Sequence, residues 1–151
     1  MATVQDLLAQ NAYVAIFDRS PPPESLAGSS ANVKFCKIDI TVVSEIASAV
    51  DSTVEWTKST GAPLGGVINC AGVAVAAKTI DAKGKPHGLD PWNFAVAVNL
   101  TGTFNLTRLV LEHLVQVEPE PGKDGERGVV VFVASAAAVS FILFLSVTTR
   151  H

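Results

Sequence analysis

Four short apolar runs alternate with longer segments of helical or irregular pattern along the chain. The runs cover residues 13–17, 33–38, 66–69 and 129–133. The first run is apolar at every position, which is typical of a strand covered on both faces of a parallel sheet. Strands that alternate with helical segments need crossover connections. The pattern therefore predicts an α/β domain with a parallel sheet.

The segments between the runs predict helices. Apolar residues at helical spacing mark a short helix over residues 4–10, which Asn11 ends. A second helix is expected from about residue 42 to 59, with Thr41 as its cap and Gly61 just past its end. The expected apolar face of the second helix consists of Ile46, Val50 and Val54.

The third expected helix begins at Asp90-Pro91, because a capping side chain is followed by a proline at the first helical position. The helical pattern can run to about Val117, where residues 118–122 break it with two prolines and a glycine.

Composition and charge exclude two classes of protein. The chain has 151 residues, 48% of them hydrophobic and 17% charged, with mean hydropathy +0.37. Such a chain can bury a core and is not intrinsically disordered. Its net charge of −3 argues against sequence-independent binding to nucleic acid.

The cysteines and histidines indicate neither a disulfide framework nor a metal site. Cys36 and Cys70 have no zinc-ligand spacing, and the three histidines are scattered. A reducing compartment, cytoplasmic or mitochondrial, is the expected location, and no targeting segment is visible in the first twenty residues.

The 22 residues from 128 to 149 carry no charge and are long enough to span a bilayer as a C-terminal anchor. The alternative is a buried strand followed by a small, serine-containing segment. We expect the alternative, because the strongly apolar part is only residues 141–147, too short to cross a hydrocarbon core of about 30 Å.

Polar residues follow each expected strand: Asp18, Asp39, Asn69-Cys70-Ala71-Gly72 and Ser135. In open parallel sheets, ligands bind beyond the carboxyl ends of the strands. A carboxylate at the position of Asp18 can accept both hydroxyl hydrogens of an adenosine ribose and would repel a 2′-phosphate, which favours NAD over NADP. The alternative for Asp18 is a cap on the following turn.

Four segments in order resemble motifs of the short-chain dehydrogenase/reductase family: Asp39-Ile40-Thr41, Asn69-Cys70-Ala71-Gly72, Asn99-Leu100-Thr101-Gly102 and Val133-Ala134-Ser135. Within the family, residues 69–87 and 118–131 look most like the branch of type 2 3-hydroxyacyl-CoA dehydrogenases. The resemblance divides the chain into a partial NAD-binding, Rossmann-like domain at residues 1–138 and a divergent apolar tail at 139–151.

The resemblance implies hydride transfer between NAD and a secondary alcohol or ketone, such as a 3-hydroxyacyl-CoA or a hydroxysteroid. It implies that Ser135 hydrogen-bonds the substrate oxygen and that Asn99 holds a water in a proton relay. The implied cofactor contacts are Asp18 at the ribose, Asp39 and Ile40 at the adenine, and the backbone of Asn69, Cys70, Ala71 and Gly72 along the cofactor.

The chain departs from the family pattern at both ends. The family begins with a strand and a glycine-rich turn that holds the pyrophosphate, whereas no glycine precedes Gly28 here. The position thirteen residues after Ser135, where the family has its acid/base tyrosine, is Thr148; the one tyrosine of the sequence is Tyr13. We therefore expect an incomplete doubly wound sheet, and no turnover by these 151 residues alone.

The resemblance also predicts the strand pairing. The family's strand order 3-2-1-4-5, without strand 1, pairs residues 13–17 with 33–38 and residues 67–69 with 129–133. Two other functions stay open: a non-catalytic partner that joins a homo- or hetero-oligomer through the helix 91–117, and a tail-anchored membrane protein.

Overall fold

The computed structural model describes residues 1–27, 31–75, 77–122 and 124–135. The elements in chain order are α1 (Ala2–Ala9), β1 (Val14–Asp18), α2 (Glu24–Ala27), β2 (Val33–Lys37), α3 (Val43–Thr60), β3 (Gly66–Asn69), α4 (Leu89–Val96), the π-helix η1 (Ala97–Gly102), α5 (Thr103–Leu114) and β4 (Val129–Phe132). Each predicted strand and helix is present within a few residues of its expected bounds.

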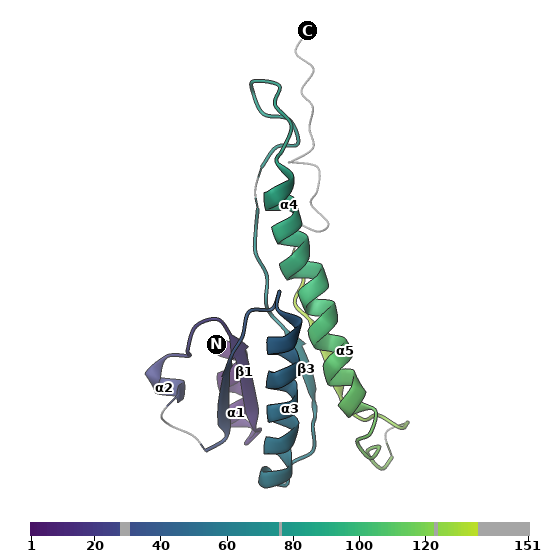
Figure 1. Ribbon diagram of the computed structural model, residues 1–151. Helices are drawn as coiled ribbons and strands as arrows, with labels where there is room; N and C mark the ends of the chain where they lie inside the picture. Colours follow the sequence, from purple (N-terminus) through teal and green to yellow (C-terminus); the bar gives the residue numbers. More distant parts are fainter. Residues whose placement is uncertain (28–30, 76, 123, 136–151) are drawn as a thin grey trace.

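The strands form two separate parallel pairs (Figure 1). β1 pairs with β2 in the register Val14 to Val33, and β3 pairs with β4 in the register Gly66 to Val129. The predicted pairing and the parallel direction are confirmed. Within the described residues, no backbone ladder joins β1 to β3, so the α/β sheet is incomplete, as expected.

One helical layer covers both strand pairs. The buried cluster at its centre consists of Ile38, Ile46, Ala49, Val50, Leu106 and Val110. Phe17 of β1 and Val67 of β3 pack against this cluster, which joins residues of α3 and α5. Ile46 is fully buried. The layer of α3 and α5 therefore connects two strand pairs that share no ladder hydrogen bonds.

The start of α3 differs from the expected cap. Val42 is the N-cap and makes no side-chain capping bond, while the Thr41 hydroxyl donates to Asp39 Oδ1 (2.7 Å). Thr41 as the helix cap was wrong because the strand-end carboxylate attracts its hydroxyl more strongly than the backbone amides of α3 do. The predicted end is confirmed, since Gly61 adopts the left-handed conformation (φ 71°) that favours glycine.

The long helix begins and ends earlier than the predicted 91–117. It starts at Leu89 with Gly88 as N-cap, so Asp90-Pro91 lies inside the first turn. It ends at Leu114 and contains the π-helix η1. A Cβ on Gly102 would lie 2.6 Å from the Ile40 carbonyl oxygen. The helix can therefore approach the segment after β2 this closely only because residue 102 is a glycine.

Of the uncharged stretch 128–149, β4 and the residues up to 135 are described, and the predicted apolar tail lies outside the described residues. Within the described part, one helix, Leu89–Leu114, is long and apolar enough to cross a membrane by length and composition. The core helix of a soluble protein can pass the same test, and α5 contributes Leu106 and Val110 to the buried cluster.

Gly102→Ala is expected to destabilise the fold by about 1–3 kcal/mol, because its Cβ would overlap backbone and side-chain atoms of Ile40. Urea unfolding measures the loss. Gly65→Ala is the matched control, since a Cβ there meets nothing within 4 Å, and its effect is expected to stay within about 0.5 kcal/mol. Equal stability of the two variants would contradict the close approach.

Candidate active site at the carboxyl edge

Asp18 lies at the carboxyl end of β1. Its Oδ1 accepts a hydrogen bond from the Ser20 backbone N–H (3.0 Å), and its backbone carbonyl accepts one from Ile38 N–H (3.0 Å). The carboxylate therefore caps the turn after the strand, which is the second of the two roles expected for it. Because the Asp18 side chain is exposed, capping leaves room for a ligand hydroxyl as well.

Asp39 lies beside it, just beyond the end of β2. Its Oδ1 accepts hydrogen bonds from the Thr41 hydroxyl (2.7 Å) and the Thr41 backbone N–H (2.9 Å). The Arg19 guanidinium Nε lies 3.7 Å from Oδ2. The Thr41 hydrogen bonds, with a smaller contribution from Arg19, lower the pKa of Asp39 below its ordinary value of 3.8. Asp39 is thus held ionised at this edge of the sheet.

Ile40 joins the edge to the helical layer. It packs against the buried cluster, and its carbonyl is the group that Gly102 approaches. The position predicted to contact adenine is consequently fixed by the long helix. The predicted adenine contact itself stays a prediction.

Asn69, at the end of β3, directs its side chain into the protein. The amide is buried and donates to Thr107 Oγ1 (3.2 Å) and the Val131 carbonyl (3.4 Å). These bonds tie β3 to α5 and β4. The residues after it, Cys70, Ala71 and Gly72, are exposed. The backbone from Asn69 to Gly72 stays the predicted cofactor contact, while the Asn69 side chain has a structural role.

Asn99, in η1, reaches the same turn. Its Oδ1 accepts a hydrogen bond from Val73 N–H (2.8 Å), and its Nδ2 donates to the Val73 carbonyl (2.9 Å). Both ends of the amide are thus engaged by one residue, which fixes the turn that carries Cys70 and Gly72. A π-helix is rare and occurs often at functional sites. In the structure Asn99 is a positioning residue, and the water relay stays a prediction.

Sequence reasoning did not identify Val73 and Thr107, which hold the two asparagine side chains. The π-helix was also not foreseen. A signal for it exists in the sequence, because Gly102 stands in the interior of a helix where glycine is unfavourable by about 1 kcal/mol relative to alanine.

Ser135 lies three residues beyond the end of β4 and is exposed. The Val133 N–H donates to the Asn69 carbonyl (3.0 Å), which keeps this segment next to the end of β3. The sequence-predicted residues therefore fall into two groups: Asp18, Asp39 and Ile40 at one strand pair, and Asn69 to Gly72, Asn99 and Ser135 at the other. The catalytic role of Ser135 stays a prediction.

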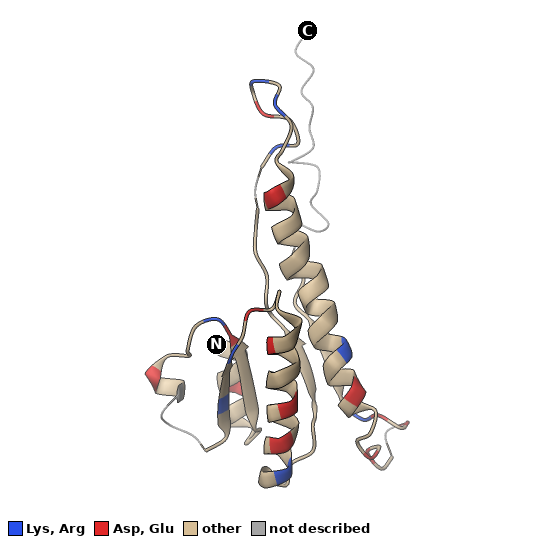
Figure 2. Cartoon of the chain, viewed as in Figure 1, with Lys and Arg blue, Asp and Glu red and all other residues tan. Residues whose placement is uncertain are grey.

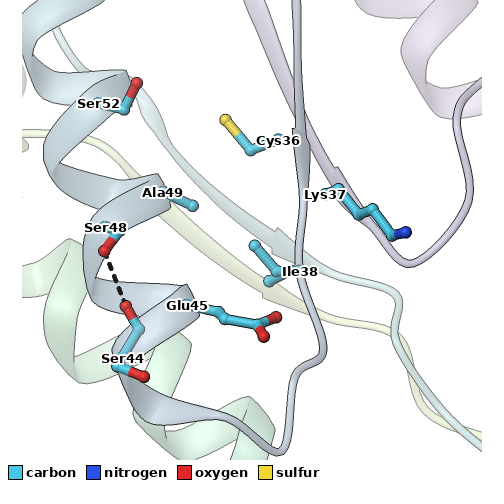
Figure 3. A pocket seen from close by; sticks show the side chains of 8 residues that line it. All are labelled: Cys36, Lys37, Ile38, Ser44, Glu45, Ser48, Ala49 and Ser52. Atoms are coloured by element: carbon cyan, nitrogen blue, oxygen red, sulfur yellow. Dashed lines mark hydrogen bonds between the residues drawn. The ribbon is translucent and has the colours of Figure 1, made fainter.

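A hollow of about 400 Å³ lies next to the first group, between β2 and α3 (Figure 3). Glu45 lines it and accepts a hydrogen bond from the Asp39 backbone N–H (2.7 Å). The Ser48 hydroxyl, also in its wall, bonds within α3 to the Ser44 carbonyl (3.0 Å). Within the described ranges, no group of three His, Cys, Asp or Glu side chains could hold a metal ion.

The pattern that defines the short chain dehydrogenase family matches residues 1–147. The chain therefore belongs to this family of oxidoreductases. Human 3-hydroxyacyl-CoA dehydrogenase type-2 is 35% identical over 144 residues, which cover 91% of this chain and 52% of the human protein. The mouse protein of that name matches over the same shares at the same identity. The chain thus spans about half the length of these relatives.

Solved structures share the fold. The crystal structure of 3-hydroxyacyl-CoA dehydrogenase type-2 from Mycobacterium avium is 24% identical and has a TM-score of 0.78, over 91% of this chain and 53% of that one. NADPH-bound carbonyl reductase from chicken fatty liver is 23% identical, with a TM-score of 0.72 over 89% of this chain and 54% of that one. The predicted Rossmann-like α/β fold, incomplete in this chain, is confirmed.

Thr41→Val is expected to raise the pKa of Asp39 toward 3.8, because the variant removes the hydroxyl donor that favours the carboxylate. A lowered native pKa stabilises the fold above the unfolded pKa, and this contribution is lost as the pH falls through the native pKa. The variant should therefore lose about 1 kcal/mol or less near neutral pH and progressively less below pH 4.

Titration of the Asp39 carboxyl by NMR measures the pKa. Thr53→Val is the control, because the Thr53 hydroxyl donates to the Ala49 carbonyl (2.8 Å) and touches no carboxylate. An Asp39 pKa that is the same in both variants would show that the hydroxyl does not stabilise the carboxylate.

Proposed function

We propose that this chain carries the adenosine-binding edge of an NAD-dependent short-chain dehydrogenase that acts on a secondary alcohol or ketone, such as a 3-hydroxyacyl-CoA or a hydroxysteroid. The observation that carries the proposal is the pair of carboxylates at one sheet edge. Asp18 and Asp39 follow neighbouring parallel strands, and Ile38 N–H bonds to the Asp18 carbonyl between them. The identity to type-2 3-hydroxyacyl-CoA dehydrogenases supports the substrate class.

The choice of NAD rests on charge. A carboxylate at Asp18 accepts hydrogen bonds from a ribose diol and repels a 2′-phosphate. The neighbouring cation is Arg19, whose Nε lies 3.7 Å from Asp39 Oδ2. The carboxylate of Asp39 therefore partly neutralises the positive charge of Arg19. The edge is therefore suited to a ribose whose two hydroxyls are free. Among the solved relatives, one from Leptospira borgpetersenii binds NAD⁺ and the chicken reductase binds NADPH.

The residues present fit only part of such a cofactor. Asp18, Asp39 and Ile40 would hold its adenosine, and the backbone at Cys70 to Gly72 would lie along it. The glycine-rich phosphate turn and the tyrosine–lysine pair of the family are not among these 151 residues. When bound, the nicotinamide supplies or accepts the hydride. Ser135 would orient the substrate oxygen, while Asn99 fixes the turn at Val73.

Adenosine binding to isotope-labelled protein, followed by NMR, tests the edge directly. We expect shifts at Asp18, Asp39 and Ile40, and affinity at least about tenfold weaker for adenosine 2′-phosphate, since one charge-assisted hydrogen bond is worth about 1.5–3 kcal/mol. Asp18→Asn should weaken the binding of adenosine and reduce the preference for adenosine over adenosine 2′-phosphate. Asp6→Asn, at an exposed position of α1, is the matched control. If the unaltered chain bound the two ligands with equal affinity, the proposed preference for NAD over NADP would be rejected.

The companion measurement concerns turnover. The purified 151-residue polypeptide, given NADH and acetoacetyl-CoA, is expected to show no oxidation above a heat-inactivated sample, because it supplies no acid/base tyrosine at the family's position. Measurable turnover would contradict the prediction that these 151 residues alone are inactive. It would not affect the prediction of adenosine binding, which is tested separately.

A second candidate function is assembly with another chain of the family through the long helix. Large apolar side chains on α4, η1 and α5 are exposed, including Trp92 (61%), Leu100 (66%) and Phe104 (63%). Figure 2 shows few charged residues along this helix. Exposed apolar surface of this extent is typical of an interface. We propose that the same helix of a second chain covers it.

Leu100→Glu is expected to dissociate such an assembly, because a carboxylate would be buried without a partner. Size-exclusion chromatography with light scattering should find a dimer or larger species for the unaltered chain and a monomer for the variant. Gln116→Glu, an exposed position beyond the end of α5, serves as control and should leave the mass unchanged. A monomeric unaltered chain would reject this function.

A further inference from the structure

Two consecutive side chains at the end of β1 favour different cofactors. A carboxylate beside an adenosine ribose selects a free 2′-hydroxyl, whereas an arginine beside it can accommodate a 2′-phosphate. Asp18 and Arg19 both stand there, and both are exposed. The planar guanidinium suits a phosphate because it can donate two parallel hydrogen bonds. The placement of the Arg19 guanidinium therefore decides whether the preference set by Asp18 prevails.

The guanidinium of Arg19 is paired with Asp39, just beyond the end of β2. Arg19 Nε lies 3.7 Å from Asp39 Oδ2, and in the described part of the chain neither side chain has another ion-pair partner. The Arg19 side chain is 73% exposed, whereas that of Asp39 is 35% exposed. The pair is therefore open to solvent on the side of Arg19, where the phosphate of a ligand could compete for the guanidinium.

The carboxylate of Asp39 is held in a fixed orientation. Its Oδ1 accepts hydrogen bonds from the Thr41 hydroxyl (2.7 Å) and from the Thr41 N–H (2.9 Å). The backbone N–H of Asp39 donates to Glu45 Oε2 (2.7 Å). Since Oδ1 is engaged by Thr41, Oδ2 is the oxygen that pairs with Arg19. An exposed arginine has many accessible rotamers, and a fixed carboxylate beside it favours those that keep the guanidinium near β2.

We propose that Asp39 determines cofactor specificity through Arg19, because its pairing with the guanidinium withholds a cation that would otherwise bind a 2′-phosphate. The inference rests on the proposed adenosine site, at which Asp18 binds the ribose. A 2′-phosphate would meet the carboxylate of Asp18 there, without a free guanidinium to compensate its charge. In this role Asp39 is a positioning residue, in addition to its proposed contact with the adenine.

The ratio of two dissociation constants, that of adenosine 2′-phosphate divided by that of adenosine, tests the inference. NMR titration of the labelled chain at low ionic strength measures both constants, because salt screens exposed charges. The two ligands share the adenine and the ribose, so a lost adenine contact cancels in the ratio. Asp39→Asn should lower the ratio at least about threefold, which is within the range that an exposed ion pair contributes.

Two further variants separate the release of Arg19 from a general loss of negative charge. Glu45→Gln removes one carboxylate from the same edge and keeps an oxygen that can accept from the Asp39 N–H, so its effect on the ratio should be much smaller. The double variant Arg19→Gln/Asp39→Asn should have the same ratio as Arg19→Gln within about twofold, because it has no guanidinium to release.

Equal effects of Asp39→Asn and Glu45→Gln on the ratio would overturn the inference. An effect of Asp39→Asn that persists without Arg19 would overturn it as well. If Asp39→Asn fails to fold, Arg19→Gln alone decides: the ratio should stay within about twofold of that of the unaltered chain, since the paired guanidinium contributes little to phosphate binding. A larger rise would show that Arg19 already reaches the phosphate, and the inference would be rejected.

The same titrations distinguish this inference from the proposed function. If the unaltered chain bound adenosine but none of the changes in the ratio depended on Arg19, only the role of Asp39 would be rejected. If the unaltered chain did not bind adenosine, the proposed function and the inference would both be rejected.

Discussion

The contact between α3 and α5 is the interaction on which the rest of this structure depends. No ladder hydrogen bond joins the two strand pairs in the described residues, so the apolar layer above them carries the connection. Ile46 is fully buried in it, and Val50, Leu106 and Val110 surround the helix contact. Apolar contact is non-directional, so it can hold two pairs in place without fixing them as tightly as a ladder would.

This helical layer determines the geometry of the candidate site. Gly102 brings the long helix against Ile40, at the end of β2, and Asn99 in the neighbouring turn of the same helix holds Val73, beyond the end of β3. One helix thus positions the carboxyl ends of strands from both pairs. The π-helix η1 places Asn99 and Gly102 where they can make these two contacts. We propose this edge as the ligand-binding edge of the chain.

Local sequence pattern was sufficient for the strands, their parallel direction and the buried face of α3, while the pairing of the strands was predicted from the family resemblance. Residues 13–17 and 66–69 are recognisable because strands buried on both faces need continuous apolar sequence. The pattern failed where a residue had two possible partners. Thr41 bonds to Asp39 rather than to α3, and the long helix starts at Leu89 rather than at Asp90-Pro91. Gly102 lies against Ile40, which is 62 residues away along the chain, and no local pattern reports that contact.

The central claim is that a single apolar layer stabilises both strand pairs. Ile46→Ala, followed by hydrogen exchange at all strand amides, tests it most directly, with exposed Val43→Ala on the same helix as control. The variant should lower the free energy of opening by about 2–5 kcal/mol, and by equal amounts in β1–β2 and in β3–β4. Loss of protection in one strand pair, with the other unchanged, would contradict the account.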